Sequence, residues 1–353
     1  MAADSQLRVV IAGGGTGGHL YPALAVARAH KEEEPDGAVL MVGRRGGPEE
    51  RLVPAARFDL ATVNIRGLDR DAVWKNVALP VLIPAALRAG LRIVDRFKPD
   101  VVLGMGGYVM APAVAAARLR GIPYVLHEKD VRPGLATRFF AGGAAAICTT
   151  LPGTERRLPR RRVELTGVPL REGFTQRTPE VPPRRLLVTG GSQGARNLNQ
   201  AVWSALADLC SRFEEVVHVA GAQGTDGVTQ HARARYRGMA FTDDMSDLMS
   251  RADLIVSRAG VGTIAEATAV GLPMILVPGT FGGGHQELNA AAMVEAGAAV
   301  RLGDAELTGA SLMATIAALD DERLRAMARA SAAAGRRDAA KRVLAILHEV
   351  SRK

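Results

Sequence analysis

The chain has 353 residues, 48% of them hydrophobic, which excludes a disordered protein and exceeds the roughly 250 to 300 residues that one hydrophobic core accommodates. We therefore expect two domains. A formal net charge of +9 would suit nucleic acid, but aromatic residues are only 4% and no basic run is interleaved with them, so we expect no nucleic-acid binding. The positive charge is explained either by an arginine-rich, solvated surface or by a role in attracting the protein to an anionic membrane or substrate.

The first predicted strand, residues 8–12, leads into the glycine-rich stretch GGGTGGH (13–19) and then into an apolar segment of helical period. Gly13, Gly15 and Gly18 match the G-x-G-x-x-G pattern of dinucleotide binding. Such a loop brings backbone amides close to a phosphate at the positive end of a helix, although many α/β proteins use the glycines only for a tight turn.

The second predicted strand tests the dinucleotide hypothesis. An NAD site needs an acidic residue where this strand ends, and the sequence has Arg44 and Arg45 there. Arginines would suit the 2′-phosphate of NADP, so an NADP-dependent oxidoreductase stays open as an alternative. His19 argues against it, because it places an ionisable side chain at the helix entry, where close packing is wanted.

Short runs rich in valine, isoleucine and leucine alternate with longer segments of helical period along the whole chain. Such runs are typical of strands buried on both faces, and the alternation predicts α/β domains with doubly wound parallel sheets. The expected strands are 8–12, 38–43, 60–65, 100–104, 123–127, 145–149, 163–166, 185–189, 215–220, 238–241, 253–257, 273–278 and 298–302.

The pattern of strand, glycine loop and helix occurs a second time. Residues 186–189 lead into GGSQGAR (190–196), and an apolar segment of helical period follows. A stretch rich in proline and charge separates the two halves and is typical of a linker. We expect two similar α/β domains, with the amphipathic C-terminal helix packing back on the first. The expected boundaries are 1–166, 167–184 for the linker, 185–335, and 336–353 for the helix.

The cysteines and the apolar stretches bear on location. Cys148 and Cys210 have neither C-x-x-C nor metal-ligand spacing, which favours a reducing cytoplasm and no structural zinc. The N-terminus has no basic segment followed by an apolar one, so we expect no signal peptide. The uncharged stretches 101–117 and 267–286 are broken by glycine and proline, so we expect no membrane-spanning helix.

Four stretches together carry a resemblance to a known family. They are GGGTGGHLYPALAVA, PDVVLGMGGYVMAPAVAAARLRGIPYVLHE, GGSQGARNLNQ and GLPMILVP, and they stand in the expected order between about residues 8 and 300. The chain resembles the MurG family of N-acetylglucosaminyltransferases, in glycosyltransferase family 28. The resemblance implies the GT-B fold, in which two Rossmann-like domains face each other across a cleft that holds the active site.

The resemblance also implies the reaction. N-acetylglucosamine would pass, with inversion, from UDP-GlcNAc on the C-terminal domain to the C4 hydroxyl of MurNAc in undecaprenyl-pyrophosphoryl-MurNAc-pentapeptide (lipid I) on the N-terminal domain. The product would be lipid II of peptidoglycan synthesis, which links the enzyme to cell shape and division. We expect no cofactor and no required metal, a peripheral place on the cytoplasmic face of the membrane, and other cell-wall proteins as partners.

Such a transfer needs a base for the acceptor hydroxyl and donors for the leaving diphosphate. His19 is our first candidate base because histidine titrates near neutral pH, with Asp130 and Glu128 as alternatives. Ser192 and the amides of 191–194 suit the diphosphate. By resemblance Arg171 would also contact the diphosphate. The plainer interpretation of Arg171 is a surface charge, and that of His19 is a residue that only packs in its loop.

The remaining contacts follow from the resemblance. Glu266 would accept hydrogen bonds from the ribose hydroxyls, the backbone near Thr242 would contact the uracil edge, and Gln286 would contact the sugar hydroxyls, with Asn289 supporting its loop. The other expected contacts of the donor segment are Val261, Gly262, Thr263, Ile264 and Ala265.

In the N-terminal half, Thr16, Gly17 and Gly18 would meet the donor sugar or the acceptor pyrophosphate. The stretch 104–108 is a second candidate cradle for the pyrophosphate.

Several residues depart from the family's usual pattern. Asp130 and Val168 stand where the family has asparagine, Gly262 replaces a larger apolar residue, and His285 stands where a second glutamine is common. These departures leave open a related UDP-sugar transferase with another sugar or lipid acceptor, and a non-catalytic scaffold that kept the fold.

A lipid acceptor requires contact with a bilayer. Residues 72–98 mix apolar side chains, among them Val73, Trp74, Leu79, Leu82 and Ile83, with basic ones, so this segment is our candidate for docking on anionic lipid, with an ordinary core helix as the alternative. The sequence Asp69-Arg70-Asp71 matches the D-x-D metal motif of another transferase fold, and here we interpret it as a surface loop.

Overall fold

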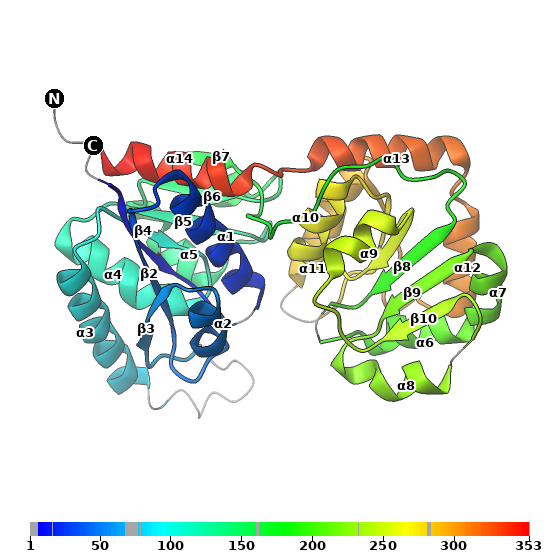
Figure 1. The fold of residues 1–353 in the computed structure, drawn as a ribbon, viewed down its shortest axis with the longest axis horizontal. Coiled ribbons are helices and arrows are strands. Elements are labelled where there is room, and N and C mark those ends of the chain that lie inside the picture. Colours follow the sequence, from blue (N-terminus) through cyan, green and yellow to red (C-terminus); the bar gives the residue numbers. More distant parts are fainter. Residues whose placement is uncertain are drawn as a thin grey trace. The chain divides into compact units, whose positions relative to one another are not determined.

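The computed structural model describes residues 6–15, 17–67, 77, 79–159, 162–191, 193–231, 233–280 and 284–352. The chain divides into two compact units. Unit 1 comprises Met1–Arg171 together with Asp338–Lys353, and unit 2 comprises Glu172–Arg337. Each unit is built around its own parallel sheet (Figure 1). The two Rossmann-like sheets confirm the predicted fold class.

Unit 1 holds a seven-stranded parallel sheet in the order β3-β2-β1-β4-β5-β6-β7. From β1 the chain adds β2 and β3 on one side of the sheet and then β4 to β7 on the other. The strands β1 and β4 pair with each other, starting at Val9 and Val101. In an open α/β sheet this change of side is the switch point, where ligands bind beyond the carboxyl ends of the strands. The strands are β1 (Arg8–Ala12), β2 (Ala38–Arg44), β3 (Asp59–Val63), β4 (Val101–Gly104), β5 (Tyr124–Glu128), β6 (Ala146–Thr149) and β7 (Val163–Leu165).

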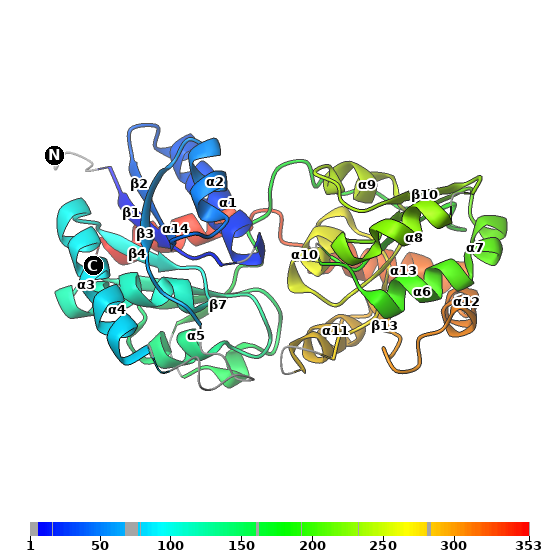
Figure 2. The ribbon, with the colours of Figure 1, turned by 90° about the horizontal axis from the view of Figure 1, so that it is seen from below.

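Helices cover both faces of this sheet, as the central strands require because nearly all their residues are buried (Figure 2). Alternate side chains of β1 point to opposite faces, so Val9 and Ile11 join one hydrophobic cluster and Val10 and Ala12 join the other. The helical segments of unit 1 are α1 (Gly17–Glu33), α2 (Glu49–Ala55), α3 (Leu79–Phe97), η2 (Tyr108–Met110), α4 (Ala111–Arg120), α5 (Leu135–Phe140), η3 (Ala141–Gly143), η4 (Glu155–Arg157) and α14 (Ala339–Ser351).

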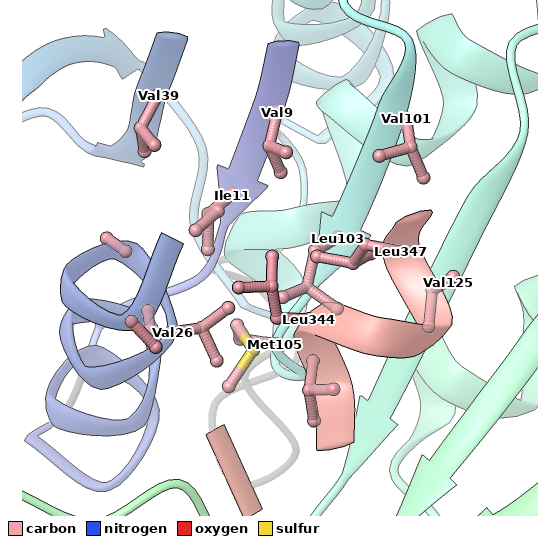
Figure 3. Close-up of a cluster of buried hydrophobic side chains, with 14 of the residues drawn as sticks. Val9, Ile11, Val26, Val39, Val101, Leu103, Met105, Val125, Leu344 and Leu347 are labelled. Atoms are coloured by element: carbon pink, nitrogen blue, oxygen red, sulfur yellow. The ribbon is translucent and has the colours of Figure 1, made fainter. Parts of the chain in front are cut away.

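The last helix of the chain, α14, returns to unit 1 and packs beside α1. Its apolar residues recur at helical spacing, so Val343, Leu344, Leu347 and Val350 all face inward and are buried. Figure 3 shows Leu344 and Leu347 among the valine and leucine side chains of the central strands. One face of the sheet therefore depends on residues from the extreme end of the sequence.

Unit 2 holds a six-stranded parallel sheet in the order β10-β9-β8-β11-β12-β13. Its switch point lies between β8 and β11, which pair from Leu186 and Leu254 onward. The strands are β8 (Arg185–Thr189), β9 (Glu215–Val219), β10 (Tyr236–Met239), β11 (Leu254–Ser257), β12 (Met274–Leu276) and β13 (Ala299–Arg301). The helical segments are α6 (Arg196–Ser204), α7 (Leu206–Arg212), η5 (Ala222–Gly224), α8 (Thr225–Gln230), α9 (Met245–Arg251), α10 (Val261–Val270), α11 (His285–Glu295), α12 (Gly309–Ala317) and α13 (Asp321–Ala334).

The segment that enters unit 2 is fixed by one carboxylate. Asp253 is buried, and its two oxygens accept hydrogen bonds from the backbone amides of Glu180, Arg184 and Arg185. The same carboxylate forms an ion pair with Arg177 at 2.7 Å. The stretch that the sequence marks as a linker is thus attached to unit 2 at its second half, in front of β8.

Each run predicted as a strand overlaps a strand of the structure, and the positions differ by a residue or two at the ends. The largest difference is β10, predicted at 238–241 and found at Tyr236–Met239. Phe241, which the pattern placed in the strand, is 60% exposed, because the chain turns there and the Thr242 hydroxyl accepts a hydrogen bond from the Asp244 amide at 3.0 Å. Among the described residues, no helix is long and apolar enough to cross a bilayer.

Candidate active site

The candidate residues of unit 1 lie around its switch point. Gly17, Gly18 and His19 form the first turn of α1, directly after the loop that follows β1. The loop after β4 and the loop after β5 lie at the same edge of the sheet, because parallel strands end on one side. Thr16, expected in this group, lies outside the described residues, as do Asp69, Arg70 and Asp71 of the surface loop and Val73 and Trp74 of the lipid-docking segment.

His19 packs against the loop that follows β4. A Cβ atom built on Gly106 would come within 3.2 Å of His19 Nε2, and one built on Gly107 would lie 3.5 Å from Cε1. Burial is the main cause that lowers the pKa of His19, to about 3, and the nearby Lys129 and His127 add to it. The imidazole is therefore neutral at pH 7. Titration of His19 near its usual neutral range is therefore not expected in the free protein, because the half-buried ring packs against the backbone of the loop after β4.

Glu49, the first residue of α2, lies beneath the glycine loop and was not singled out from the sequence. It is fully buried, and its Oε1 accepts a hydrogen bond from the Gly15 amide. One backbone amide of the loop is therefore already paired with a buried carboxylate and cannot donate a hydrogen bond to a phosphate. In the sequence, Glu49 is only a glutamate in the first turn of the helix after β2. An acidic residue is common there because it interacts favourably with the helix dipole, so the pattern does not indicate this role.

The loop after β5 is organised by Glu128. This buried carboxylate accepts hydrogen bonds from the amides of Asp130 at 3.1 Å and Gly134 at 3.0 Å, and burial raises its pKa. Beside it, His127 is buried with Nε2 2.9 Å from the Gly167 carbonyl oxygen, and burial lowers its pKa to about 4. Both oxygens of Glu128 thus serve the loop that presents Asp130.

Arg171, at the end of the first segment of unit 1, lies over the ring of Tyr21 in α1. The guanidinium carbon is 4.8 Å from the ring centroid, a cation–π arrangement. Tyr21 is two residues after His19 on the same helix, so Arg171 belongs to the surroundings of the first turn of α1. This contact makes it more than a freely solvated surface charge.

The glycine loop of unit 2 follows β8 and precedes α6. The Gly191 amide donates to the Thr189 hydroxyl at 3.1 Å, and the Gly194 amide donates to the Gly191 carbonyl oxygen at 2.9 Å. Two of the amides expected to meet diphosphate are therefore engaged within the loop. Ser192 lies outside the described residues.

The donor segment predicted from the sequence forms the start of α10, on the other side of the unit 2 switch point. Val261 begins the helix, and Gly262, Thr263 and Glu266 are half-buried on its first turns. Ile264 is buried and Ala265 is half-buried. The Asn289 side chain donates to the Ala259 carbonyl oxygen at 3.2 Å, so α11 fixes the turn that leads into this helix.

An arginine in that turn was missed by the sequence analysis. Arg258 is buried and pairs with Asp304 at 2.5 Å, while the same nitrogen donates to the Val277 carbonyl oxygen at 3.3 Å. It joins the ends of β11 and β12 and so supports the start of α10. A single arginine in the stretch SRAG gives no signal of this role in the sequence.

The last two candidates lie on loops of unit 2. Gln286, in the first turn of α11, accepts a hydrogen bond through Oε1 from the Gly279 amide at 2.8 Å, which fixes the loop after β12. Thr242 is in the turn after β10, two strands away from β8 in the sheet. The structure therefore groups the glycine loop, α10 and Gln286 near the central strands and places Thr242 nearer the edge.

Each of the two units matches a known family of domains. Residues 9–149 match the glycosyltransferase family 28 N-terminal domain, and residues 185–343 match the glycosyltransferase family 28 C-terminal domain. The solved structure of MurG from Acinetobacter baumannii is 27% identical, with a TM-score of 0.79 over 97% of this chain and 99% of that one.

Curated relatives match over nearly their whole length. One from Moorella thermoacetica is 38% identical over 97% of this chain and 98% of its own. One from Desulforudis audaxviator is 39% identical over 98% of this chain and 99% of its own. Both are named UDP-N-acetylglucosamine--N-acetylmuramyl-(pentapeptide) pyrophosphoryl-undecaprenol N-acetylglucosamine transferase.

Two Rossmann-like units with candidate residues at both switch points, and matches of this kind on both, define a glycosyltransferase. The oxidoreductase alternative is therefore wrong. The chain belongs to glycosyltransferase family 28, whose two domain models together span most of it.

Proposed function

We propose that the chain transfers N-acetylglucosamine from UDP-N-acetylglucosamine to the C4 hydroxyl of the N-acetylmuramyl residue of lipid I, with inversion, in peptidoglycan synthesis. The observation that carries the proposal is the agreement, over 97% of the chain, with transferases named for this donor and this acceptor. The position of the candidate residues at the carboxyl ends of parallel strands supports it, because α/β proteins bind ligands there. The sugar nucleotide is a substrate in this account and not a cofactor.

Unit 2 would hold the donor. Glu266 is half-buried on α10, and its carboxylate can accept two hydrogen bonds from the vicinal hydroxyls of a ribose. The N-terminus of α10 supplies a positive helix end for the diphosphate. Because the Gly191 and Gly194 amides are engaged, the diphosphate would rely on this helix end and on the rest of the glycine loop. Gln286 would contact the sugar, and the backbone near Thr242 the uracil.

Unit 1 would hold the acceptor, with His19 as the base. A neutral imidazole can accept the proton of the C4 hydroxyl as the new bond forms. A group whose pKa is about 3 is a weak base, however, so the role requires that the acceptor raise that pKa. The pyrophosphate of lipid I carries the negative charge that would do so. Asp130, held by Glu128, is the alternative base, and Gly17 and Gly18 would contact the pyrophosphate.

The first turn of α3 supports a place at the membrane surface. Three apolar side chains are exposed at this end of the helix: Val77, two residues before it, at 80%, Val81 in the first turn at 75%, and Ile83 just after that turn at 56%. The same helix carries Arg88 and Arg92 further along. Apolar side chains that enter the interface, together with basic ones that meet anionic headgroups, are the usual means of reversible docking. This would place the enzyme on the cytoplasmic face, where other cell-wall synthesis proteins could meet it.

A transferase for a different UDP-sugar is the second candidate, because of the departures at Gly262 and Asp130. Among the described residues, a Cβ atom added to Gly262 would meet nothing within 4 Å, so the first turn of α10 leaves room that a larger residue would fill. Asp130, when ionised, offers only acceptors to an N-acetyl sugar.

A donor competition separates the two candidates. The purified enzyme is given a lipid I analogue with radiolabelled UDP-GlcNAc, and unlabelled UDP-GlcNAc, UDP-GalNAc or UDP-glucose competes. The proposal expects label in the lipid fraction that only UDP-GlcNAc suppresses well. Equal or better suppression by another UDP-sugar would favour the second candidate. No label in the lipid would refute the proposal, and transfer from radiolabelled UDP-GalNAc or UDP-glucose in its place would then support the second candidate.

A further inference from the structure

Two histidines and a glutamate meet where α1 and α14 pack together, away from the candidate active site. His30 is in the last turn of α1, Glu34 directly follows that helix, and His348 is near the end of α14. One possible ligand atom from each residue lies within 4.8 Å of the other two. The cluster joins two segments from opposite ends of the sequence.

Each of the two histidines has a ring nitrogen without a hydrogen bond among the described residues. His30 is fully buried, and its Nε2 lies 3.0 Å from the Leu7 carbonyl oxygen, but its Nδ1 is a buried atom with no hydrogen-bond partner among the described residues. His348 Nε2 is likewise buried without a hydrogen bond, although Glu34 Oε1 is only 3.3 Å away. Leaving two buried nitrogens unpaired is costly unless another ligand meets them.

The outer atoms of the same side chains are held in place by one residue. The Leu7 amide donates to Glu34 Oε2 at 2.8 Å, and the Leu7 carbonyl oxygen is the partner of His30 Nε2. This is the arrangement by which proteins orient metal ligands, since a histidine that binds a metal through one nitrogen donates from the other to a carbonyl group. It leaves His30 Nδ1, which has no hydrogen bond among the described residues, and Glu34 Oε1, 3.3 Å from His348 Nε2, available to a metal.

The spacing and chemistry suit a transition metal. Two ligands about 2.0 to 2.1 Å from a tetrahedral zinc ion lie roughly 3.3 to 3.4 Å apart, and the distance between His348 Nε2 and Glu34 Oε1 is 3.3 Å. The cluster as a whole spans up to 4.8 Å, so its side chains would move closer together when the metal binds. Imidazole nitrogens with one carboxylate favour zinc, cobalt or nickel over calcium or magnesium, which prefer oxygen ligands. The exposed Glu33, whose Oε1 is 3.9 Å from the same nitrogen, or a water would complete the coordination.

We propose that His30, Glu34 and His348 form a binding site for a divalent transition metal of the zinc class, which fastens α14 to α1. The role is structural. His30 is eleven residues beyond His19 on one helix, about 16 Å at the rise of an α-helix, so a metal there does not touch the candidate active site. The proposal is independent of the proposed transferase function.

The test uses the full chain without a polyhistidine tag, stripped with a chelator and titrated with Co²⁺. The proposal expects one saturable equivalent with the visible absorption bands of four- or five-coordinate cobalt, displaced by Zn²⁺, and a Zn²⁺-dependent rise in the unfolding temperature. His348→Gln and Glu34→Gln should each weaken Co²⁺ binding by about tenfold or more. Circular dichroism of the metal-free variants checks that they remain folded.

A histidine elsewhere provides the matched control. His231 in unit 2 stacks on Trp203 at 5.0 Å between ring centroids, and His231→Gln should bind Co²⁺ as the unmodified chain does. If the unmodified chain binds Co²⁺ no more tightly than His348→Gln, or if Zn²⁺ leaves the unfolding temperature unchanged, the cluster is an ion pair only and the proposal is wrong.

Discussion

The imidazole of His19 lies against the backbone of Gly106. A Cβ atom on Gly106 would stand 3.1 Å from Cδ2 of that ring, and its φ of +89° is a conformation that other residues rarely adopt. The loop after β4 therefore sets the position of His19.

Replacing Gly106 should move His19 and impair turnover. We expect Gly106→Ala to lower kcat by about 10- to 100-fold, because a small displacement of a reacting group costs that much, while UDP affinity stays unchanged. Gly121→Ala is the control. It imposes a similar strain at φ +68°, but its Cβ meets nothing within 4 Å among the described residues. Equal loss in both variants would mean that general strain, and not the contact with His19, is responsible.

His19→Ala should lower kcat by roughly 100-fold or more without weakening UDP binding, since a base acts in the transition state. Steady-state kinetics beside UDP titration measures both quantities. An unchanged kcat would remove His19 from the mechanism and leave Asp130 as the base.

The pH profile gives an independent test of the same residue. The neutral imidazole is the active form, so activity is lost only when pH falls through its pKa, which is about 3 in the free protein. The profile of kcat/KM should show no inflection from His19 near its usual 6.5, whereas that of kcat, which reports the bound complex, should show an acidic limb at higher pH. An inflection of kcat/KM near 6.5 that disappears in His19→Gln would contradict the burial seen here.

Glu266→Ala should mainly weaken binding of the donor nucleotide. Loss of two hydrogen bonds to a carboxylate corresponds to roughly 100-fold or more in UDP affinity, with kcat at saturating donor largely kept. Calorimetric titration with UDP measures the change, and Glu295→Ala, at an exposed glutamate of the neighbouring α11, should bind UDP normally. Wild-type affinity in Glu266→Ala would refute the role.

Val81→Glu should weaken sedimentation with anionic vesicles severalfold, because it puts a charge into the proposed apolar contact. Leu119→Glu is the matched control. Leu119 is also exposed, at 61%, but it lies beside Arg120, which pairs with Asp95 near the other end of α3. Equal vesicle binding by the two variants would contradict the assignment of the docking surface to the start of α3.

Acid should destabilise unit 2 through His218. This buried residue lies between Asn199 Oδ1 at 3.1 Å and the Tyr236 hydroxyl at 3.0 Å, and burial lowers its pKa from 6.5 to about 4. Between those pH values only the unfolded chain binds the proton, so stability falls as pH drops through this window, by about 3 kcal/mol in all.

Urea unfolding across the window should show that slope, and His218→Gln should reduce it, although the variant is less stable at every pH. The same slope in both proteins would assign the acid sensitivity to other groups, such as His127.

Much of the fold was predictable because strand burial leaves a clear pattern. Apolar runs such as 8–12 and 185–189 became β1 and β8 with the predicted bounds. The pattern was less certain at β10, an edge strand with Gly238 inside it, where tertiary packing and the turn at Thr242 decide the ends.

The site was predictable where a motif carries the chemistry and not where the fold brings residues together. Glycine loops pointed to His19 and to the start of α10, but Glu49 beneath the first loop and Arg258 in front of α10 act through partners far along the chain. The low pKa of His19 depends on Lys129 and on burial against the loop after β4, neither of which the local sequence reveals. The pairing of His30 with His348 depends likewise on α14 returning to unit 1.

The most direct measurement follows the reacting atoms. The enzyme is incubated with UDP-GlcNAc and either a lipid I analogue or the same analogue lacking the C4 hydroxyl of its MurNAc residue, and the products are analysed by mass spectrometry and NMR. Our account predicts one equivalent of UDP and a β-linked disaccharide at C4 from the first acceptor, and no disaccharide from the second. A disaccharide formed with the deoxy acceptor, or an α linkage with the first, would contradict it.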